Sequence, residues 1–277
     1  MNRVSEVITS SVAQLTESDT ARLDVELLLA EALGKNRTWL FTWPEHELDA
    51  KQLKEFNRLL SQRIQGRPIA HILGRREFWG LDLECNEHTL IPRPETELLV
   101  ETALDLDLPS GARVLDLGTG TGAIALALAS ERPDWKITAL DIVPEAIELA
   151  KRNAANLKVS SIHWCLSSWF EAVDKDQKFE LIVSNPPYVE ENSPWLDIGD
   201  LRFEPRSALT AGGEGMLDLE FLVKGAVKYL AKGGFLLLEH GNTQAQSLEK
   251  LFISNGYKSV RSIQDLAKHD RVSIGQL

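Results

Sequence analysis

The order of strands and helices in the last two thirds of the chain constrains the fold more than any other feature of its 277 residues. Apolar runs of strand length alternate there with segments whose apolar residues recur at helical spacing. We predict strands at residues 114–117, 136–142, 162–165, 181–183, 235–239, 257–263 and 272–274, and helices at 123–130, 144–154, 217–231 and 243–254. Because a helix between two strands lets them run parallel, this order predicts an α/β fold whose mostly parallel sheet is covered on both faces. The last two strands have no helix between them and predict an antiparallel C-terminal edge.

The first quarter of the chain has a different pattern, with helical spacing and no strands. Residues 4–15, 20–33 and 50–65 place apolar side chains on one helical face, and a short helix at 39–41 ends before Pro44. Residues 76–92 are extended and contain turn residues, which is typical of a β-hairpin. We therefore predict a helical domain at 1–75, a β-hairpin linker at 76–92 and an α/β domain at 93–277.

The charge of the chain is unevenly distributed. Lys and Arg number 30 against 41 Asp and Glu, for a net charge of -11. Residues 1–75 carry as many basic as acidic side chains, so the whole acidic excess lies in residues 76–277. Such a balance argues against a protein that acts by binding nucleic acid non-specifically. We expect no direct nucleic-acid partner.

Cysteine content and hydropathy bear on the compartment. The only cysteines are Cys85 and Cys165, too few for a disulfide framework, which favours a reducing compartment. The N-terminus has no apolar core of signal-peptide type, and no run of 18 apolar residues occurs. We expect a cytoplasmic protein that does not contact a membrane. The six histidines have no metal-ligand spacing, so we expect no metal.

A glycine-rich turn joins the first strand of the α/β part to its helix. It reads Asp116-Leu117-Gly118-Thr119-Gly120-Thr121-Gly122. The glycines let the backbone turn tightly beside a ligand, and the start of the helix offers free N–H groups. Asp141 ends the next strand, where a carboxylate can accept hydrogen bonds from both hydroxyls of a ribose. The turn and Asp141 predict an adenosine-containing cofactor, and from the turn alone a nicotinamide cofactor stays open.

The pattern Asp-Leu-Gly-x-Gly-x-Gly, with an acidic residue closing the second strand, resembles motifs I and II of class I S-adenosylmethionine-dependent methyltransferases. The resemblance implies a Rossmann-like sheet and S-adenosyl-L-methionine as the cofactor, with S-adenosyl-L-homocysteine as its product. It implies that the loop from Gly118 to Gly122 passes under the methionine part and that Asp141 holds the ribose. The family's adenine border corresponds to Leu166-Ser167-Ser168-Trp169-Phe170, so Trp169 would flank the adenine. Ser168 stands where the family often has Asp.

The tetrapeptide Asn185-Pro186-Pro187-Tyr188 follows the strand at 181–183. Two prolines cannot continue a sheet ladder, so the chain leaves the sheet at its carboxyl edge, beside the predicted cofactor. A residue before proline is held extended, so the Asn185 side-chain oxygen and the Pro186 carbonyl can converge on one NH2 group. The two acceptors would favour positive charge developing on nitrogen and direct its attack on a methyl group, while the Tyr188 ring supports a planar group. The motif resembles [D/N/S]-P-P-[Y/F/W] of amino-group methyltransferases.

Further motifs lie in one order along the chain: Ala70-His71-Ile72-Leu73-Gly74, Arg76-Glu77-Phe78-Trp79-Gly80, Leu90-Ile91-Pro92-Arg93-Pro94-Glu95-Thr96-Glu97, Val183-Ser184 before Asn185, and Arg202-Phe203-Glu204-Pro205. Together they closely resemble the HemK/PrmC family of peptide chain release factor N5-glutamine methyltransferases, over nearly the whole chain. The resemblance implies methyl transfer to the glutamine of the Gly-Gly-Gln motif in class-1 release factors, which modulates translation termination.

The same resemblance implies a role for each motif residue. Asn185 and Pro186 would hold the glutamine amide, Pro187 and Tyr188 would shape its slot, and Asn185 would also border the cofactor. Arg93, Glu95 and Glu97 would line the entrance or form a salt-bridged linker. Residues 1–75 would dock the release factor, and the protein would act as a monomer. Three other functions stay open: a glutamine methyltransferase of a ribosomal protein, an amino methyltransferase of DNA or RNA bases, and a cofactor-binding regulator that transfers nothing.

Overall fold

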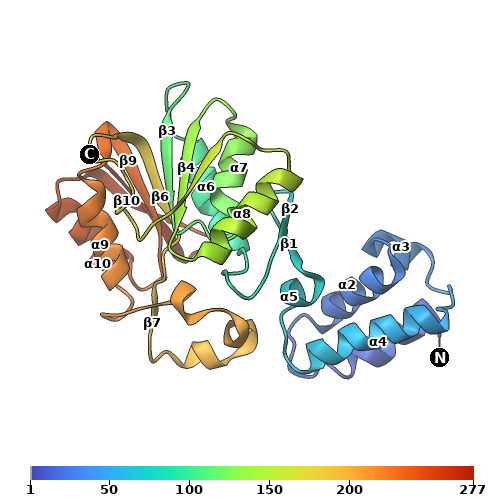
Figure 1. Cartoon of the computed structure of the whole chain (residues 1–277). Helices are drawn as coiled ribbons and strands as arrows, with labels where there is room; N and C mark the ends of the chain where they lie inside the picture. Colours follow the sequence, from blue (N-terminus) through green and yellow to red (C-terminus); the bar gives the residue numbers. More distant parts are fainter. Residues whose placement is uncertain (1) are drawn as a thin grey trace. The chain divides into compact units, whose positions relative to one another are not determined.

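The computed structural model describes residues 2–277, which divide into two compact units (Figure 1). The first unit contains the chain up to Arg75 together with Pro194–Phe203, and the second contains Arg76–Ser193 and Glu204–Leu277. The sequence pattern did not separate Pro194–Phe203 from the α/β part that surrounds it. In the described residues, no helix is long and apolar enough to cross a membrane.

The first unit is helical. Its helices are α1 (Val4–Val12), α2 (Ala21–Leu33), α3 (Arg37–Thr42), α4 (Ala50–Ile64) and α5 (Ile69–Leu73). Helix α4 begins with a capping box, in which Asp49 accepts from the Gln52 backbone and the Gln52 side chain accepts from the Asp49 backbone. Helix α2 ends at Gly34, whose left-handed φ of 61° suits glycine. Side chains that include Leu28, Phe56 and Leu59 form the buried core of this unit.

An arginine attaches the returning segment to the helices of the first unit. The segment contains the short 3₁₀ helices η2 (Pro194–Asp197) and η3 (Gly199–Phe203). Arg63 Nε donates to Asp24 at 2.7 Å, and its Nη1 donates to Asp200 at 2.9 Å. Arg63 and Asp24 are largely buried, so their charges are poorly screened by solvent. This contact joins positions that are far apart in the chain, which explains why local periodicity did not reveal it.

The second unit contains a seven-stranded sheet. Its strands are β3 (Arg113–Leu117), β4 (Lys136–Asp141), β5 (Ile162–Leu166), β6 (Phe179–Ser184), β9 (Leu230–Glu239), β10 (Lys258–Gln264) and β11 (Asp270–Gln276). Their order is β10-β11-β9-β6-β3-β4-β5. Strand β11 pairs antiparallel with both β9 and β10, and the pairs from β9 to β5 are parallel. The predicted α/β fold with an antiparallel C-terminal edge is confirmed.

Helices cover both faces of this sheet (Figure 1). On one face lie α6 (Glu97–Leu104), α7 (Ala123–Glu131) and α8 (Pro144–Asn156); on the other lie α9 (Leu217–Ala226) and α10 (Ala245–Ser254). Successive strand side chains point to opposite faces, so Leu181 packs in one core cluster and Ile182 in the other. Because both faces of these strands pack against apolar side chains, the strand sequences are continuous apolar runs.

Several element boundaries differ from the predictions, and the largest differences lie between α9 and β9 and in the linker hairpin. Helix α9 ends at Ala226 rather than residue 231, and β9 begins at Leu230 rather than residue 235. The Tyr229 ring stacks on Phe170 with centroids 4.8 Å apart, and its carbonyl accepts from Phe179, so the chain joins the sheet here. Residues 89–91 form no strand; the hairpin instead pairs β1 (Arg75–Phe78) with β2 (Leu81–Glu84). Tertiary packing overrode local propensity at each place.

A second small sheet follows the tetrapeptide motif. Strands β7 (Val189–Glu190) and β8 (Thr210–Ala211) pair in parallel. The 3₁₀ helix η4 (Arg206–Ala208) precedes β8. The pairing brings the chain on either side of the Pro194–Phe203 segment together, so Ser207 reaches the same edge of the main sheet as Asn185.

Candidate active site

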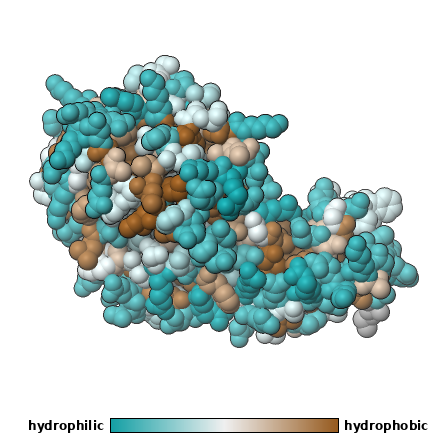
Figure 2. Space-filling view, in the orientation of Figure 1, coloured by the Kyte–Doolittle hydropathy of each residue, from teal (hydrophilic) through white to brown (hydrophobic). Residues whose placement is uncertain are grey.

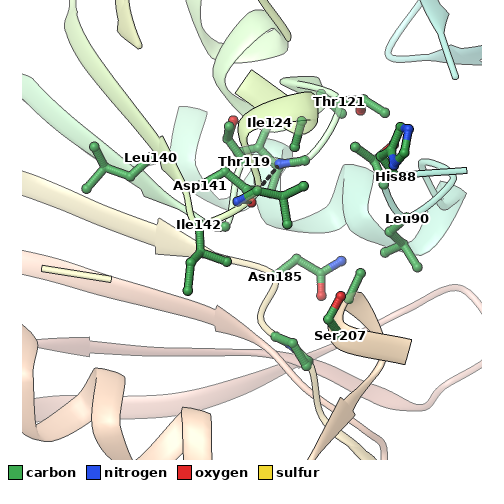
Figure 3. A pocket seen from close by; sticks show the side chains of 18 of the residues that line it. His88, Leu90, Thr119, Thr121, Ile124, Leu140, Asp141, Ile142, Asn185 and Ser207 are labelled. Atoms are coloured by element: carbon green, nitrogen blue, oxygen red, sulfur yellow. Dashed lines mark hydrogen bonds between the residues drawn. The ribbon is translucent and has the colours of Figure 1, made fainter. Parts of the chain in front are cut away.

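A cavity of about 330 Å³ lies at the carboxyl ends of β3, β4, β5 and β6. Ligands of α/β sheets bind at this edge because the loops that follow parallel strands meet there. Eight of the predicted residues line it: Gly118, Thr119, Gly120, Thr121, Asp141, Trp169, Asn185 and Pro187. Figure 3 shows the Asn185 side chain projecting into the space between Asp141 and Ser207. Gly122, Pro186 and Tyr188 are adjacent in the chain but do not line the cavity.

The glycine loop between β3 and α7 is held by backbone bonds to the next strand. The N–H groups of Gly118 and Thr119 both donate to the Leu140 carbonyl at 2.9 Å. Gly118, Gly120 and Gly122 all have left-handed φ values, of 74°, 55° and 84°. A Cβ at Gly122 would stand 3.1 Å from Ala150 and Trp164, so only glycine lets α7 pack this closely on α8 and β5. These contacts and φ values fix the shape of the loop.

Asp141 connects the end of β4 to this loop. One carboxylate oxygen accepts from the Gly120 N–H at 2.8 Å, and the other accepts from Val143 at 2.9 Å. Burial raises the pKa of Asp141, and the backbone N–H donors oppose that rise. The Ile142 backbone N–H also donates to this carboxylate, and two carboxylate oxygens together accept about four hydrogen bonds, so acceptor capacity remains for a hydroxyl from the cavity. The geometry suits a ribose.

The Trp169 ring packs against the glycine loop. Its ring lies 3.6 Å from the position that a Cβ on Gly118 would take, and its own backbone has a left-handed φ of 45°. The Ser167 hydroxyl donates to the Trp169 carbonyl at 3.0 Å, and the Trp169 side chain donates to Asp218 at the start of α9. A non-glycine residue in this backbone region is strained, and the bonds to Ser167 and Asp218 hold Trp169 there. Ser168 also lines the cavity.

The face of the second unit seen in Figure 2 carries a patch of hydrophobic side chains surrounded by polar ones. Among the exposed large apolar residues, Ile142 follows β4 directly and Leu166 ends β5. Ile142 lines the cavity and is 65% exposed. A planar apolar ligand group resting between these strand ends would remove such surface from water.

Asp116 lies beneath the loop and is completely buried. Its Oδ2 accepts from the Thr119 hydroxyl at 2.6 Å, and its Oδ1 has no hydrogen-bond partner within residues 2–277. Burial raises the pKa of Asp116 to about 7. The sequence singled out Asp116 only as part of the motif, because its burial depends on the packing of α7 over β3.

The raised pKa of Asp116 predicts a pH-dependent stability. The folded protein keeps a proton on Asp116 that the unfolded chain releases near pH 4, so the stability that this proton confers is lost as pH rises toward 7. Relative to the wild type, Asp116→Asn should therefore gain about 1–3 kcal/mol of unfolding free energy between pH 5 and pH 7.5. Urea unfolding without cofactor at several pH values measures this difference. Asp134→Asn is the control, because the Arg132 guanidinium lowers the pKa of Asp134 well below this range. A constant difference for Asp116→Asn would contradict the prediction.

The tetrapeptide Asn185–Tyr188 leaves the sheet at the end of β6. Asn185 Nδ2 donates to the hydroxyl of Thr96, which ends η1 (Pro94–Thr96), at 3.0 Å. Pro186 is buried, and the Tyr188 hydroxyl donates to Glu239 Oε1 at 3.1 Å. Burial raises the pKa of Tyr188 far above its usual value, so the hydroxyl keeps its proton.

Thr96 and Glu239 were not predicted as site residues. Glu239 ends β9, is 1% exposed, and has its pKa raised by burial to about 7. Hydrogen bonding by the Thr96 and Tyr188 hydroxyls opposes that rise. The only sequence signal for Glu239 is an acidic residue directly after an apolar strand run, which is too common to stand out.

Two of the residues predicted to line the entrance, Arg93 and Glu97, have separate partners. Arg93 lines the cavity and forms an ion pair with Glu204, whose side chain is fully buried. Glu204 also accepts from the Ile91 backbone at 2.9 Å, and Glu97 accepts from the Trp79 backbone at 2.9 Å. The Arg93–Glu204 ion pair therefore stabilises the segment that leads into η1. The Glu97 bond stabilises the turn between β1 and β2.

The donor set favours an organic cofactor. Within residues 2–277, no group of three or more His, Cys, Asp or Glu side chains is arranged to hold a metal ion. The cavity volume lies within the range of small-molecule sites, roughly 300–1000 Å³. Backbone N–H groups, the Asp141 carboxylate and the Trp169 ring meet in it, and these suit an adenosine with a polar tail.

Comparisons with known proteins agree with this geometry. Residues 6–74 match the family model "PrmC N-terminal domain", and residues 94–218 match "Methyltransferase small domain". A curated release factor glutamine methyltransferase of Shewanella oneidensis is 51% identical over 274 residues, which is 99% of this chain and 96% of that protein. Its counterpart in Pseudomonas aeruginosa is 49% identical and covers 95% of both chains.

A solved structure supports the fold independently. The crystal structure of a methyltransferase from Pyrococcus furiosus superposes with a TM-score of 0.55 at 21% identity, covering 79% of this chain and 98% of that one. The identity is too low to carry more than the fold. The two curated relatives, by contrast, share 51% and 49% sequence identity with this chain and cover 99% and 95% of it. This chain belongs to the family of release factor glutamine methyltransferases.

Proposed function

We propose that this protein transfers a methyl group from S-adenosyl-L-methionine to the side-chain amide nitrogen of the glutamine in the Gly-Gly-Gln motif of class-1 peptide chain release factors. The observation that carries the proposal is that Asn185 and Asp141 line one cavity, although they follow different strands. Asp141 offers acceptors for a ribose, and Asn185 offers an acceptor for an amide. The family's relatives carry the substrate in their name.

The cofactor would be held by three groups of this chain. Asp141 would accept from the ribose hydroxyls, the loop Gly118–Gly122 would border the methionine part, and Trp169 would pack against the adenine. When bound, S-adenosylmethionine supplies an electrophilic methyl group. The bonds from Gly118 and Thr119 to the Leu140 carbonyl hold the loop in shape beside the cavity.

The glutamine amide would be held by Asn185 and Pro186. An amide nitrogen is a weak nucleophile because its lone pair is delocalised, and positive charge develops on it as the new bond to carbon forms. Two acceptors on its two hydrogens stabilise that charge and orient the lone pair toward the methyl group. The new nitrogen–carbon bond replaces the methyl–sulfur bond of the cofactor, which would leave as S-adenosyl-L-homocysteine. One of the two protons then passes to water, so the product is a neutral N-methyl amide. Pro187 and Tyr188 would shape the slot around the planar group.

A labelling experiment tests the proposal. The purified protein is incubated with S-adenosylmethionine carrying a labelled methyl group and with a purified release factor, a ribosomal large-subunit protein fraction or DNA. We expect label only in the release factor, and peptide mapping should place it on the Gly-Gly-Gln glutamine. Label in ribosomal protein or DNA but not in release factor would overturn the assignment, and cofactor binding without any transfer would favour a regulator.

We also infer that the helical part, residues 1–75, docks the release factor and that the protein acts as a cytoplasmic monomer without nucleic acid. This part carries no net charge, whereas the acidic excess lies in residues 76–277. It exposes two large aromatic residues, Phe41 and Trp43, each 57% exposed at the end of α3. Exposed aromatic side chains are typical anchors of protein interfaces.

Replacing both aromatic residues should weaken docking without affecting the chemistry. Phe41→Ser combined with Trp43→Ser is expected to raise the KM for intact release factor about tenfold, equivalent to one lost contact of about 1.4 kcal/mol, with kcat nearly unchanged. Leu266→Ser, at a fully exposed residue of the second unit, serves as the matched control. Steady-state kinetics measure both constants, and an unchanged KM would remove these residues from the docking surface.

A further inference from the structure

An asparagine side chain can bind a substrate amide only if its oxygen faces that amide. The two ends of the Asn185 amide are nearly equal in size and opposite in hydrogen-bonding character. If the NH2 end of Asn185 faced the substrate amide, N–H donors would face each other. The positive charge that develops on the substrate nitrogen would then be destabilised. The orientation of this amide therefore decides whether the proposed transfer can occur.

Thr96 supplies the contact that selects one orientation. Asn185 Nδ2 donates to the Thr96 hydroxyl oxygen at 3.0 Å, and this places Oδ1 at the other end of the amide. Thr96 is only 4% exposed, so water does not compete for this bond. A hydroxyl can also donate, however, and a Thr96 hydrogen turned toward Asn185 would attract Oδ1 and favour the wrong orientation.

Glu239 removes that ambiguity. The Tyr188 hydroxyl donates to Glu239 Oε1 at 3.1 Å, and hydrogen bonding by Thr96 opposes the rise in the pKa of Glu239 that burial causes. An ionised carboxylate only accepts hydrogen bonds, so it favours the Thr96 hydrogen pointing toward it. With the Thr96 hydrogen directed to Glu239, the Thr96 oxygen can only accept from Asn185. Asn185 then donates to Thr96, and Thr96 donates to Glu239.

The cost of burying Glu239 argues against a purely structural role. The residue is 1% exposed, and its Oε2 has no close partner within residues 2–277. A buried carboxylate without complete hydrogen bonding is destabilising, and an apolar residue of similar volume would pack there at lower cost. Glu239 lies at the end of β9, next to β6, whose last residue precedes Asn185. Such an arrangement is expected where a functional side chain must be oriented.

We propose that Thr96 and Glu239 are positioning residues that orient the Asn185 amide so that its oxygen faces the substrate. The proposal rests on the proposed function for the role of Asn185. Thr96 lines the cavity, but its proposed role is to hold the Asn185 nitrogen, and that of Glu239 is to hold the Thr96 hydrogen. Both contacts join segments far apart in sequence, with 89 positions between Asn185 and Thr96.

Kinetics of four variants test the proposal. Thr96→Val keeps the shape of Thr96 but removes its hydroxyl, and we expect kcat to fall about 10- to 100-fold with KM for release factor and cofactor affinity within threefold. Thr96→Ser keeps the hydroxyl and should stay within threefold of the wild type. Glu239→Met removes the acceptor at similar length and should lower kcat in the same manner. Thr102→Val on α6, a buried threonine that bonds only to Leu98 of its own helix, is the matched control and should be unchanged.

A second measurement does not depend on transfer. The full chain is labelled with ¹⁵N-asparagine, and the side-chain NH2 signal of Asn185 is identified by its loss in Asn185→Asp. Its hydrogens should exchange slowly with water in the wild type and in Thr96→Ser, and rapidly in Thr96→Val. Unchanged exchange in Thr96→Val, or equal loss of kcat in Thr96→Ser and Thr96→Val, would overturn the positioning role. If the wild type methylated no release factor, the proposed function would fail, while the exchange rates would still decide the orientation network.

Discussion

Replacing Asn185 with alanine is expected to lower methyl transfer to the release factor about 100- to 1000-fold. The alanine removes the oxygen that would accept from the substrate amide, and the Pro186 carbonyl alone cannot fix the direction of attack. The Asn185 side chain is part-buried and makes its bond to Thr96 at 3.0 Å, so its loss leaves the surrounding backbone in place. Cofactor affinity should stay within about threefold, because Asp141 and the glycine loop do not depend on Asn185.

Single-turnover transfer and calorimetric cofactor binding measure the two quantities separately. Asn192→Ala makes the same substitution in an exposed loop beyond β7 and should leave both unchanged. Equal losses of transfer and of cofactor affinity in Asn185→Ala would show that Asn185 serves mainly the cofactor. That outcome would also remove the basis for a role of Thr96 in orienting the substrate.

Replacing Asp141 with alanine should produce the opposite pattern. We expect cofactor affinity to fall about 100-fold or more, because a charged acceptor for two hydroxyls is worth about 1.5–3 kcal/mol per hydrogen bond. The same carboxylate accepts from Gly120 at 2.8 Å and Val143 at 2.9 Å, so the loop also loses one of its attachments to β4. At saturating cofactor the chemical step should recover most of its rate, since the Asn185 site is intact.

Isothermal titration with S-adenosyl-L-homocysteine measures the loss. Asp134→Ala is the matched control, because Asp134 precedes β4 and lies at the opposite end of that strand from Asp141. Full affinity in Asp141→Ala would contradict the ribose assignment. The two variants therefore separate cofactor binding from substrate orientation, which a single inactive variant could not do.

One rule about parallel sheets explains why most of the predicted site residues lie together. Because β3, β4 and β6 run parallel, the residues that follow their carboxyl ends meet at one edge of the sheet. Gly118, Asp141 and Asn185 follow these strands, so recognising the strands was enough to place the residues in one cavity. Two further residues of the site were missed. Thr96 lies on a 3₁₀ turn before α6, which this rule does not reach. Glu239 ends β9, which is also parallel to β6, but an acidic residue after an apolar strand is too common to stand out.

Burial decided the properties that sequence could not supply. Asp116 and Glu239 are ordinary carboxylates in the sequence, yet burial raises the pKa of each to about 7. The Arg63 contact with Asp200, which assigns Pro194–Phe203 to the helical unit, likewise exists only in three dimensions. Desolvation depends on everything packed around a group, and most of those neighbours are remote in the chain.

The amino-acid order alone was sufficient for the α/β sheet with its antiparallel edge, the glycine turn and the family, because these depend on periodicity and on motifs of consecutive residues. Tertiary structure alone decided where α9 ends, which carboxylates have a pKa raised by burial, and which hydroxyl faces Asn185. These features arise from contacts between distant segments, whose energies no local pattern contains. Sequence and tertiary structure therefore both contribute at Asn185. The motif places an amide side chain there, and the fold determines which atom of that amide faces the cavity.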